Sequence, residues 1–193
     1  MKKFKNLLLS VLVIVGLCAN GEELMIDNSH SEVGFSIKHM MISNVKGKFE
    51  SFDAEIDYDI KKMQFNQLEA TIETTSINTG IEKRDDHLRS DDFFDVLNHP
   101  EITFVMTNYK ADGDEGVMTG DLTIRGVTKE IKLDVTVNGT VKDFSGNTLV
   151  GFTLEGKINR KDFGLTWNKL LEAGGFAVAD KVKIVIELET MAM

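Results

Sequence analysis

The chain has 193 residues, of which 42% are hydrophobic and 27% are charged. This length suits one domain with a substantial buried core. The formal net charge of −9 at pH 7 argues against nucleic acids and anionic membrane surfaces as partners, because both repel an acidic protein.

Residues 1–21 have the layout of a secretory signal peptide. Three lysines within the first five residues precede an apolar run at 7–17, and small residues follow. The apolar run is about half as long as a membrane span of roughly 20 residues, so we expect no stable membrane anchor.

Cys18, the only cysteine, would leave with this peptide. Lipidation at Cys18 is the weaker alternative, because the bulky Leu17 precedes it. Cleavage near residue 21 would remove three lysines and change the net charge from −9 to −12. The sequence therefore predicts a periplasmic or secreted domain at 22–193 that folds without disulfides.

From about residue 24 onward, apolar and polar residues alternate, which predicts antiparallel strands with one buried and one solvated face. The parity of the pattern slips between Phe49 and Phe52, where we expect a β-bulge. Short connections rich in turn-forming residues indicate sequential hairpins in the second half of the chain. The clearest alternating segments are 33–37, 68–72, 102–106, 118–124, 131–137, 150–158 and 182–188.

Two segments do not alternate. Residues 81–97 are predicted to be helical, with Ser90 as an N-cap and acidic residues in the following turn. Residues 160–179 mix large apolar side chains with glycines, which predicts a short helix or an irregular crossover.

Phe93 and Phe94 are adjacent within the first of these segments. On a helix they would join other apolar residues in a broad face that packs against a sheet or across a barrel mouth. This predicts a lid or plug. The other residues of the face are Leu88, Val96 and Leu97.

About eight strands with one apolar face each have exposed edges, and closure into an antiparallel barrel removes those edges. A β-sandwich is the alternative. Whether the interior is hollow stays open at this stage, because small inward residues either leave room for a ligand or fill a tapering core. These residues are Gly47, Ala54, Ala70, Gly120, Gly139 and Gly156.

His87, Asp91 and Asp95 would share one stripe of the predicted helix, at a spacing that metal ligands or an acid–base pair can use. A solvated helix face rich in aspartate explains the same spacing. The common nucleophile, zinc-protease and phosphate-loop motifs are absent from the sequence. We therefore expect neither an enzyme nor a cofactor, and keep the metal or acid–base site as an alternative.

Four stretches of the sequence resemble the YceI family of secreted lipid-binding proteins. They are SINTGIEKRDDHLRSDDFFDVLNHPEITF (76–104), GDLTIRGVTKEIKLDV (120–135), INRKDFGLTWN (158–168) and ADKVKIVIELE (179–189). The resemblance implies a lipocalin-like, eight-stranded antiparallel barrel that encloses a long-chain apolar ligand, a polyisoprenoid or a fatty-acid-type amphiphile. It also implies export and no catalytic activity, and homodimers occur in the family.

The sequence departs from the family pattern at His99, where an aromatic residue is common, and at Glu130, where proline often lies. Charged residues of the matched motifs would either tie the helical segments to the barrel or meet a ligand headgroup. The first role is favoured. These residues are Arg84, Asp85, His87, Arg160 and Asp162.

We therefore predict non-catalytic binding of an apolar chain inside the barrel, with hydrogen bonds to its polar end from His39, Asn168 or the segment 84–92. An interaction module with a solid core is the alternative from another class. The predicted wall and lid residues are Phe35, Ile37, Phe49, Leu68, Ile72, Phe93, Phe104, Met106, Leu122, Phe152, Trp167 and Phe176.

Overall fold

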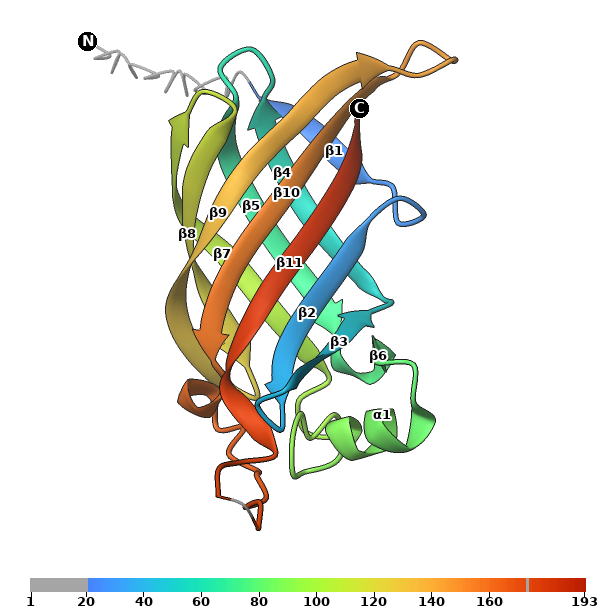
Figure 1. The fold of residues 1–193 in the computed structure, drawn as a ribbon. Helices are drawn as coiled ribbons and strands as arrows, with labels where there is room; N and C mark the ends of the chain where they lie inside the picture. Colours follow the sequence, from blue (N-terminus) through green and yellow to red (C-terminus); the bar gives the residue numbers. More distant parts are fainter. Residues whose placement is uncertain (1–20, 173) are drawn as a thin grey trace, which may run out of the picture.

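A computed structural model of the chain describes residues 21–172 and 174–193. The predicted signal peptide lies outside the described residues, except for Gly21. The described chain is an all-β structure with one short α-helix (Figure 1). Its strands are β1 (Glu22–Ile26), β2 (Glu32–His39), β3 (Ser43–Phe49), β4 (Phe52–Asp59), β5 (Gln64–Glu73), β6 (Ile77–Asn78), β7 (Glu101–Asp112), β8 (Glu115–Ile124), β9 (Val127–Lys142), β10 (Thr148–Asn159) and β11 (Val178–Ala192).

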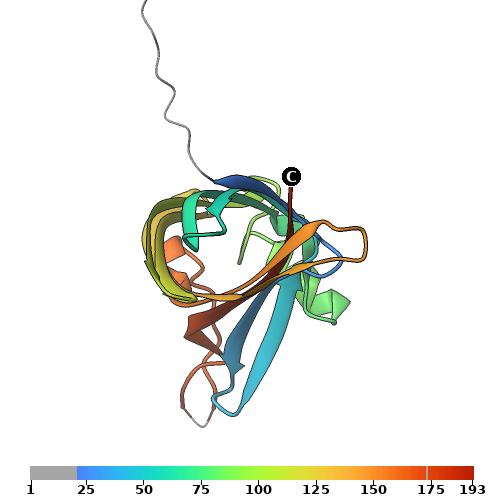
Figure 2. The same ribbon diagram turned by 90° about the horizontal axis from the view of Figure 1, so that it is seen from above.

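Eight of these strands form a closed antiparallel barrel. The hydrogen-bonded order is β1-β4-β5-β7-β8-β9-β10-β11, and β1 closes the ring by pairing with β11. Figure 2, a view along the barrel, shows the ring of strands. The predicted barrel is confirmed, and the sandwich alternative is wrong because the edges of the sheet are joined.

The predicted alternation is present strand by strand. In β8, Met118, Gly120, Leu122 and Ile124 are buried, whereas the residues between them are more exposed. In β10, Val150, Phe152 and Leu154 are buried in the same alternating way. Because successive side chains of a strand point to opposite faces, one face of each strand lines the interior.

The strands β2, β3 and β6 extend the wall at the end of the barrel that carries the helix. β2 pairs with β11, and β3 pairs with both β2 and β6. The predicted β-bulge between Phe49 and Phe52 is wrong, because the change of parity there is a two-residue break between β3 and β4, which do not pair with each other. There the Glu50 amide donates to the Ser76 carbonyl (3.2 Å), and the Glu73 amide donates to the Ser51 carbonyl (3.0 Å).

The helix α1 spans only Glu82–Arg89, so the predicted helix at 81–97 is too long. Ser90 is the C-cap rather than an N-cap, and its extended backbone (φ −70°, ψ 173°) ends the helix. Its hydroxyl donates to the His87 carbonyl (2.7 Å). Asp95 then adopts a left-handed backbone with φ 51°. Serine and aspartate favour such local alternatives over a continuous helix.

The segment at 160–179 agrees with the predicted irregular crossover. A 3₁₀ helix, η2, spans Arg160–Phe163, and the described residues 164–172 and 174–177 before β11 are loop, apart from a single bridge between Leu170 and Phe176. A second 3₁₀ helix, η1, spans Thr74–Ser76. In the described ranges, no helix is long and apolar enough to cross a membrane.

The upper end of the barrel, opposite α1, is filled by an aromatic cluster. Tyr58, Phe65, Tyr109 and Phe152 are buried, and neighbouring rings lie 4.7 to 5.1 Å apart between centroids. Burial raises the pKa of Tyr58 to about 12 and also raises the pKa of Tyr109. The interior is therefore packed solid at this end.

Candidate functional site

Below the aromatic cluster the barrel encloses an apolar cavity of about 160 Å³, the middle cavity. Strands from all around the ring supply its wall, and Asp53 is the only charged residue among the lining residues. The packing that closes the upper end therefore does not continue through the middle of the barrel. The predicted residues on this wall are Phe35, Phe49, Leu68, Ile72, Phe104 and Leu122.

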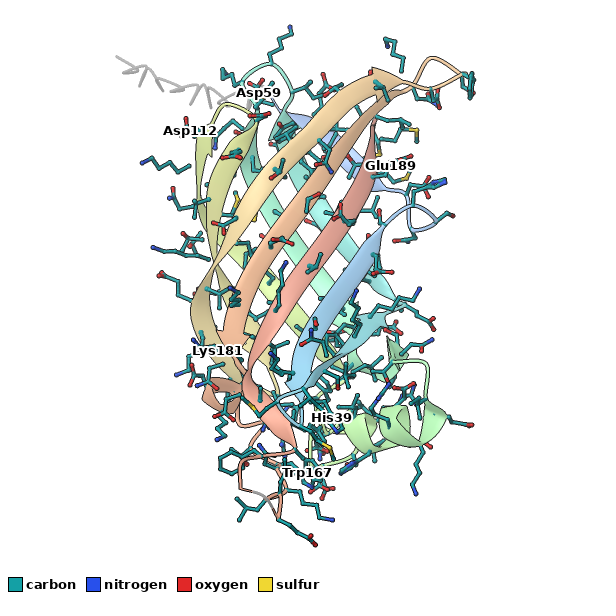
Figure 3. All side chains as sticks on the ribbon, viewed as in Figure 1. His39, Asp59, Asp112, Trp167, Lys181 and Glu189 are labelled. Carbon is teal, nitrogen blue, oxygen red and sulfur yellow. The ribbon has the colours of Figure 1, made fainter. Side chains whose placement is uncertain are left out.

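A second cavity of about 270 Å³, the lower cavity, lies at the end that carries α1. In Figure 3, His39 and Trp167 lie at this end, whereas Asp59 and Asp112 lie at the other. The two cavities are adjacent, because Phe35, Phe94 and Ile124 line both. The predicted residues on the lower wall are Phe35, Ile37, His39, Phe93 and Trp167.

The lining residues of the two cavities together extend along much of β11. On β11 the lining residues run from Leu188 in the middle cavity to Val178 in the lower cavity. Ten residues of strand cover ~33 Å, or ~25 Å along the axis of a barrel whose strands tilt by ~40°. The hydrocarbon layer of one bilayer leaflet is thinner, at ~15 Å.

The segment after α1, residues 90–97, covers the lower cavity, and we call it the lid segment. The Phe93 ring lies 5.3 Å from the Trp167 ring, and the Phe94 ring lies 5.8 Å from the Phe49 ring, between centroids. Arg125 Nη1 donates to the Phe93 carbonyl (3.1 Å) and fixes the lid segment to the β8–β9 turn. Leu97, however, is 93% exposed and does not belong to the predicted apolar face.

Four predicted site residues line neither cavity. Phe152 belongs to the aromatic cluster, and Met106 lies beside a register shift between β7 and β8. Asn168 is used by the backbone, since its amide side chain bonds both the N–H and the carbonyl of Val178 (3.1 and 2.7 Å). Phe176 is half exposed, with the Lys161 ammonium 5.7 Å from its ring centroid.

Gly139 is exposed, so its predicted inward position is wrong, and the other five small residues divide into two kinds. Ala54 and Ala70 face each other across β4 and β5 and line the middle cavity, so they leave space. Gly47 and Gly156 make room for neighbours instead, because a Cβ at either position would lie 2.5 or 2.6 Å from the Phe35 ring or the Leu133 side chain. Both interpretations of the small residues therefore apply, at different positions.

Several wall residues were not among the predicted site residues, although they follow the same inward parity. Ile131, Leu133 and Leu154 continue the alternating faces of their strands into the middle cavity. Phe94 was assigned to the predicted lid, and it lies between the two cavities. The apolar–polar alternation of the sequence is the signal that identifies Ile131, Leu133 and Leu154 as inward-facing.

Charged residues around α1 mostly bind the backbone of the preceding segment. Asp85 is buried, and its carboxylate accepts hydrogen bonds from the N–H of Thr79 (3.0 Å) and from the Thr79 hydroxyl. Arg84 donates to the Thr79 hydroxyl (2.7 Å) and carbonyl (2.8 Å), and Arg89 donates to the Ile77 carbonyl (2.9 Å). These contacts fit the structural role that the sequence favoured.

Arg160, which also lines the lower cavity, likewise binds backbone groups of a neighbouring segment. It is only 4% exposed, and its Nε and Nη1 atoms donate to the carbonyls of Ala179, Leu165 and Trp167. Burial lowers the pKa of Arg160, and the nearby Asp180 carboxylate opposes this effect. The guanidinium therefore orders the crossover segment around Trp167.

The structure does not bring together the candidate metal or acid–base residues His87, Asp91 and Asp95. The helix that would have aligned them ends at Arg89, and His87 Nε2 instead lies 2.9 Å from Asp92 Oδ2. In residues 21–172 and 174–193, the one group of three metal-type ligands within 4.8 Å of one another is Asp27, His30 and Glu189. None of these three lines either cavity.

A solved YceI protein from Campylobacter jejuni is 41% identical, with a TM-score of 0.73 over 87% of this chain and 96% of that one. A UPF0312 protein from Staphylococcus epidermidis is 41% identical over 164 residues, or 84% of this chain and 94% of the relative. A polyisoprenoid binding domain from Saccharophagus degradans shares the fold at 16% identity, with a TM-score of 0.61 over 89% and 99%.

The family comparison covers nearly all of the described barrel. The family model of the YceI-like domain matches residues 24–190, which begin within β1 and end two residues before the end of β11. This range contains both cavities, the lid segment and the crossover segment. The chain therefore belongs to the YceI-like domain family.

Proposed function

We propose that this protein binds and carries a long-chain apolar lipid inside its barrel, without catalysing a reaction. The observation that carries this proposal is the pair of adjacent cavities, whose total length exceeds the hydrocarbon depth of one leaflet. An alkyl or isoprenoid tail fits a wall in which apolar side chains alternate inward from every strand.

Burial of the tail supplies the binding energy. Each methylene removed from water contributes about 0.8 kcal/mol, so a tail of a dozen methylenes supplies on the order of 10 kcal/mol before the cost of immobilising it. No specific polar contact is needed along the middle cavity. Selectivity among tails would then follow their length and branching.

Two further points support the proposal. The Saccharophagus domain of the same fold is described as binding polyisoprenoids, which places that ligand class among the candidates here, together with fatty-acid-type amphiphiles. The N-terminal sequence supports action in the periplasm or outside the cell, where a lipid in transit needs shielding from water.

Native mass spectrometry of the gently purified mature protein tests this function. We expect a bound mass that organic solvent extracts and that is then identified as a long-chain lipid. The rival class, an interaction module with no ligand, predicts a protein without bound mass that also fails to take up added lipids. That result would refute the carrier function.

A further inference from the structure

The charges at the lower cavity differ from those of the rest of the molecule. The chain as a whole carries more acidic than basic residues, 31 against 22. The side chains that line the lower cavity nevertheless include two arginines, one lysine and two histidines, and no carboxylate among the described residues. They are Arg84, Arg160, Lys38, His39 and His87.

Arg160, which lines the lower cavity, has a donor that no protein acceptor uses. Its Nη2 atom is buried and makes no hydrogen bond within the described structure, although Nε and Nη1 are fully engaged. The nearest carboxylate oxygen, on Asp180, is 3.7 Å from Nη2 and lies closer to Lys161 Nζ, at 3.0 Å. A buried charged donor without an acceptor is costly, and an anionic oxygen of a ligand would satisfy it.

Nearby carboxylates do not neutralise the positive charge of the residues that line the lower cavity. Asp92 contacts His87, but its side chain is 52% exposed and points toward solvent and the imidazole rather than lining the cavity. Asp85 is engaged by Thr79. The polar end of a ligand in the lower cavity would thus meet mainly donors and positive charge.

We infer that the lower cavity is an anion site, and that the ligand is an amphiphile whose single headgroup is a carboxylate or a phosphate. This inference rests on the proposed function. The tail occupies the middle cavity, and the headgroup accepts a charge-assisted hydrogen bond from Arg160 Nη2, with His39 and Lys38 at the outer side. Arg84 adds positive charge from the helix side.

Titration of the mature protein with three ligands of equal chain length tests the inference. The ligands are palmitic acid, hexadecyl phosphate and hexadecan-1-ol, each kept below the concentration at which it aggregates. Trp167 is the only tryptophan and lines the lower cavity, so its fluorescence reports binding directly. We expect at least one of the two anions to bind tenfold or more tightly than the alcohol, about the contribution of one charge-assisted hydrogen bond.

The ratio of anion affinity to alcohol affinity is the measured quantity in the variants. Arg160→Gln should reduce the ratio to about one, since it removes the charge and the free donor. Because Arg160 also orders the crossover segment, its variant is first checked by thermal unfolding. If it does not fold, the double variant Lys38→Glu/His39→Glu carries the test, and it should lower the ratio about tenfold or more by placing carboxylates at the site.

Lys132→Glu on the outer face of β9 is the matched charge reversal, and its ratio should equal that of the wild type.

Equal binding of all three ligands by the wild type would overturn the anion site and leave the carrier function intact. Binding of none of them would instead count against the carrier function. An unchanged ratio in the folded Arg160 variant, or in the double variant that replaces it, would also overturn the inference. Tighter binding of palmitic acid or of hexadecyl phosphate distinguishes a carboxylate from a phosphate headgroup.

Discussion

The ring of Phe93 lies 5.3 Å from the ring of Trp167, and the His87 ring contacts both at 5.0 and 4.9 Å between centroids. Phe93 belongs to the lid segment, and Trp167 belongs to the crossover segment between η2 and β11. Two loops that are 74 residues apart in sequence thus meet through aromatic contacts over the lower cavity. We propose that this contact gates the lower cavity for a ligand that enters at this end.

Truncation of the gate should speed ligand release. In Phe93→Ala we expect the dissociation rate of a fluorescent apolar probe such as N-phenyl-1-naphthylamine to rise on the order of tenfold, because most affinity changes appear in dissociation. Stopped-flow fluorescence measures the rate. Leu97→Ala is the control, because Leu97 lies in the same segment and is 93% exposed. Equal rates in Phe93→Ala and wild type would contradict the gate.

Filling the middle cavity should displace the tail. Ala70→Phe adds a ring where Ala70 and Ala54 leave space, so retained lipid per protein should fall by more than about half, with a stability change within about 1–3 kcal/mol. Solvent extraction and mass spectrometry measure the lipid. Val105→Phe adds the same ring at the partly exposed neighbouring position on β7, and it should retain the wild-type amount. Full lipid content in a folded Ala70→Phe protein would place the tail elsewhere.

Phe152 should affect stability more than ligand binding. Phe152→Ala opens the aromatic cluster and should lower the free energy of unfolding by about 3–5 kcal/mol, which corresponds to a fall in Tm of roughly 10 °C. Phe144→Ala, at a fully exposed phenylalanine, should leave Tm unchanged. If Phe152→Ala keeps its Tm and loses lipid, Phe152 touches the ligand and the upper end is not solid.

The two tyrosines make the stability depend on alkaline pH. Burial raises the pKa of Tyr58 to about 12, whereas a tyrosine in the unfolded chain ionises near 10. The folded state therefore holds the proton more tightly, so the stabilisation is complete below about pH 10 and is lost as the pH rises toward 12. Tyr58 alone would account for about 3 kcal/mol of this loss.

Near-ultraviolet absorbance of tyrosinate provides the measurement. We expect the folded protein at pH 11 to give a clearly smaller tyrosinate signal than the same protein in urea at that pH, because burial raises the pKa of both tyrosines and an unfolded tyrosine ionises near pH 10. Because the chain has only Tyr58 and Tyr109, and both are buried, no exposed tyrosine obscures the result. Ionisation of a folded protein near pH 10 would show that the cluster is open to water.

The sequence predicted the wall of the barrel better than the segments that cover it. Alternation locates Leu122 and Phe104 on the inside because successive side chains of a strand point to opposite faces, and this period is interrupted only at a register shift such as the one after Met106. No comparably fixed period predicts where the helix that begins near residue 81 ends. Its end depends on the extended backbone of Ser90 and the left-handed backbone of Asp95, which helix propensity does not resolve.

The sequence also does not predict how far along the barrel axis each inward residue lies. Phe152 and Phe104 have the same parity, yet Phe152 closes the upper end and Phe104 lines the middle cavity. Periodicity says which face a side chain occupies, and it gives no height along the barrel axis. That height depends on strand register and on the interruption between β3 and β4, both of which arise from long-range pairing.

The aromatic cluster at the upper end also sets the order of events in any exchange of cargo. With one end blocked by rings, a molecule must back out by the route through which it came, so a donor and an acceptor cannot be served at the same time. Each delivery would then require the same rim, first turned toward the source and afterwards toward the recipient.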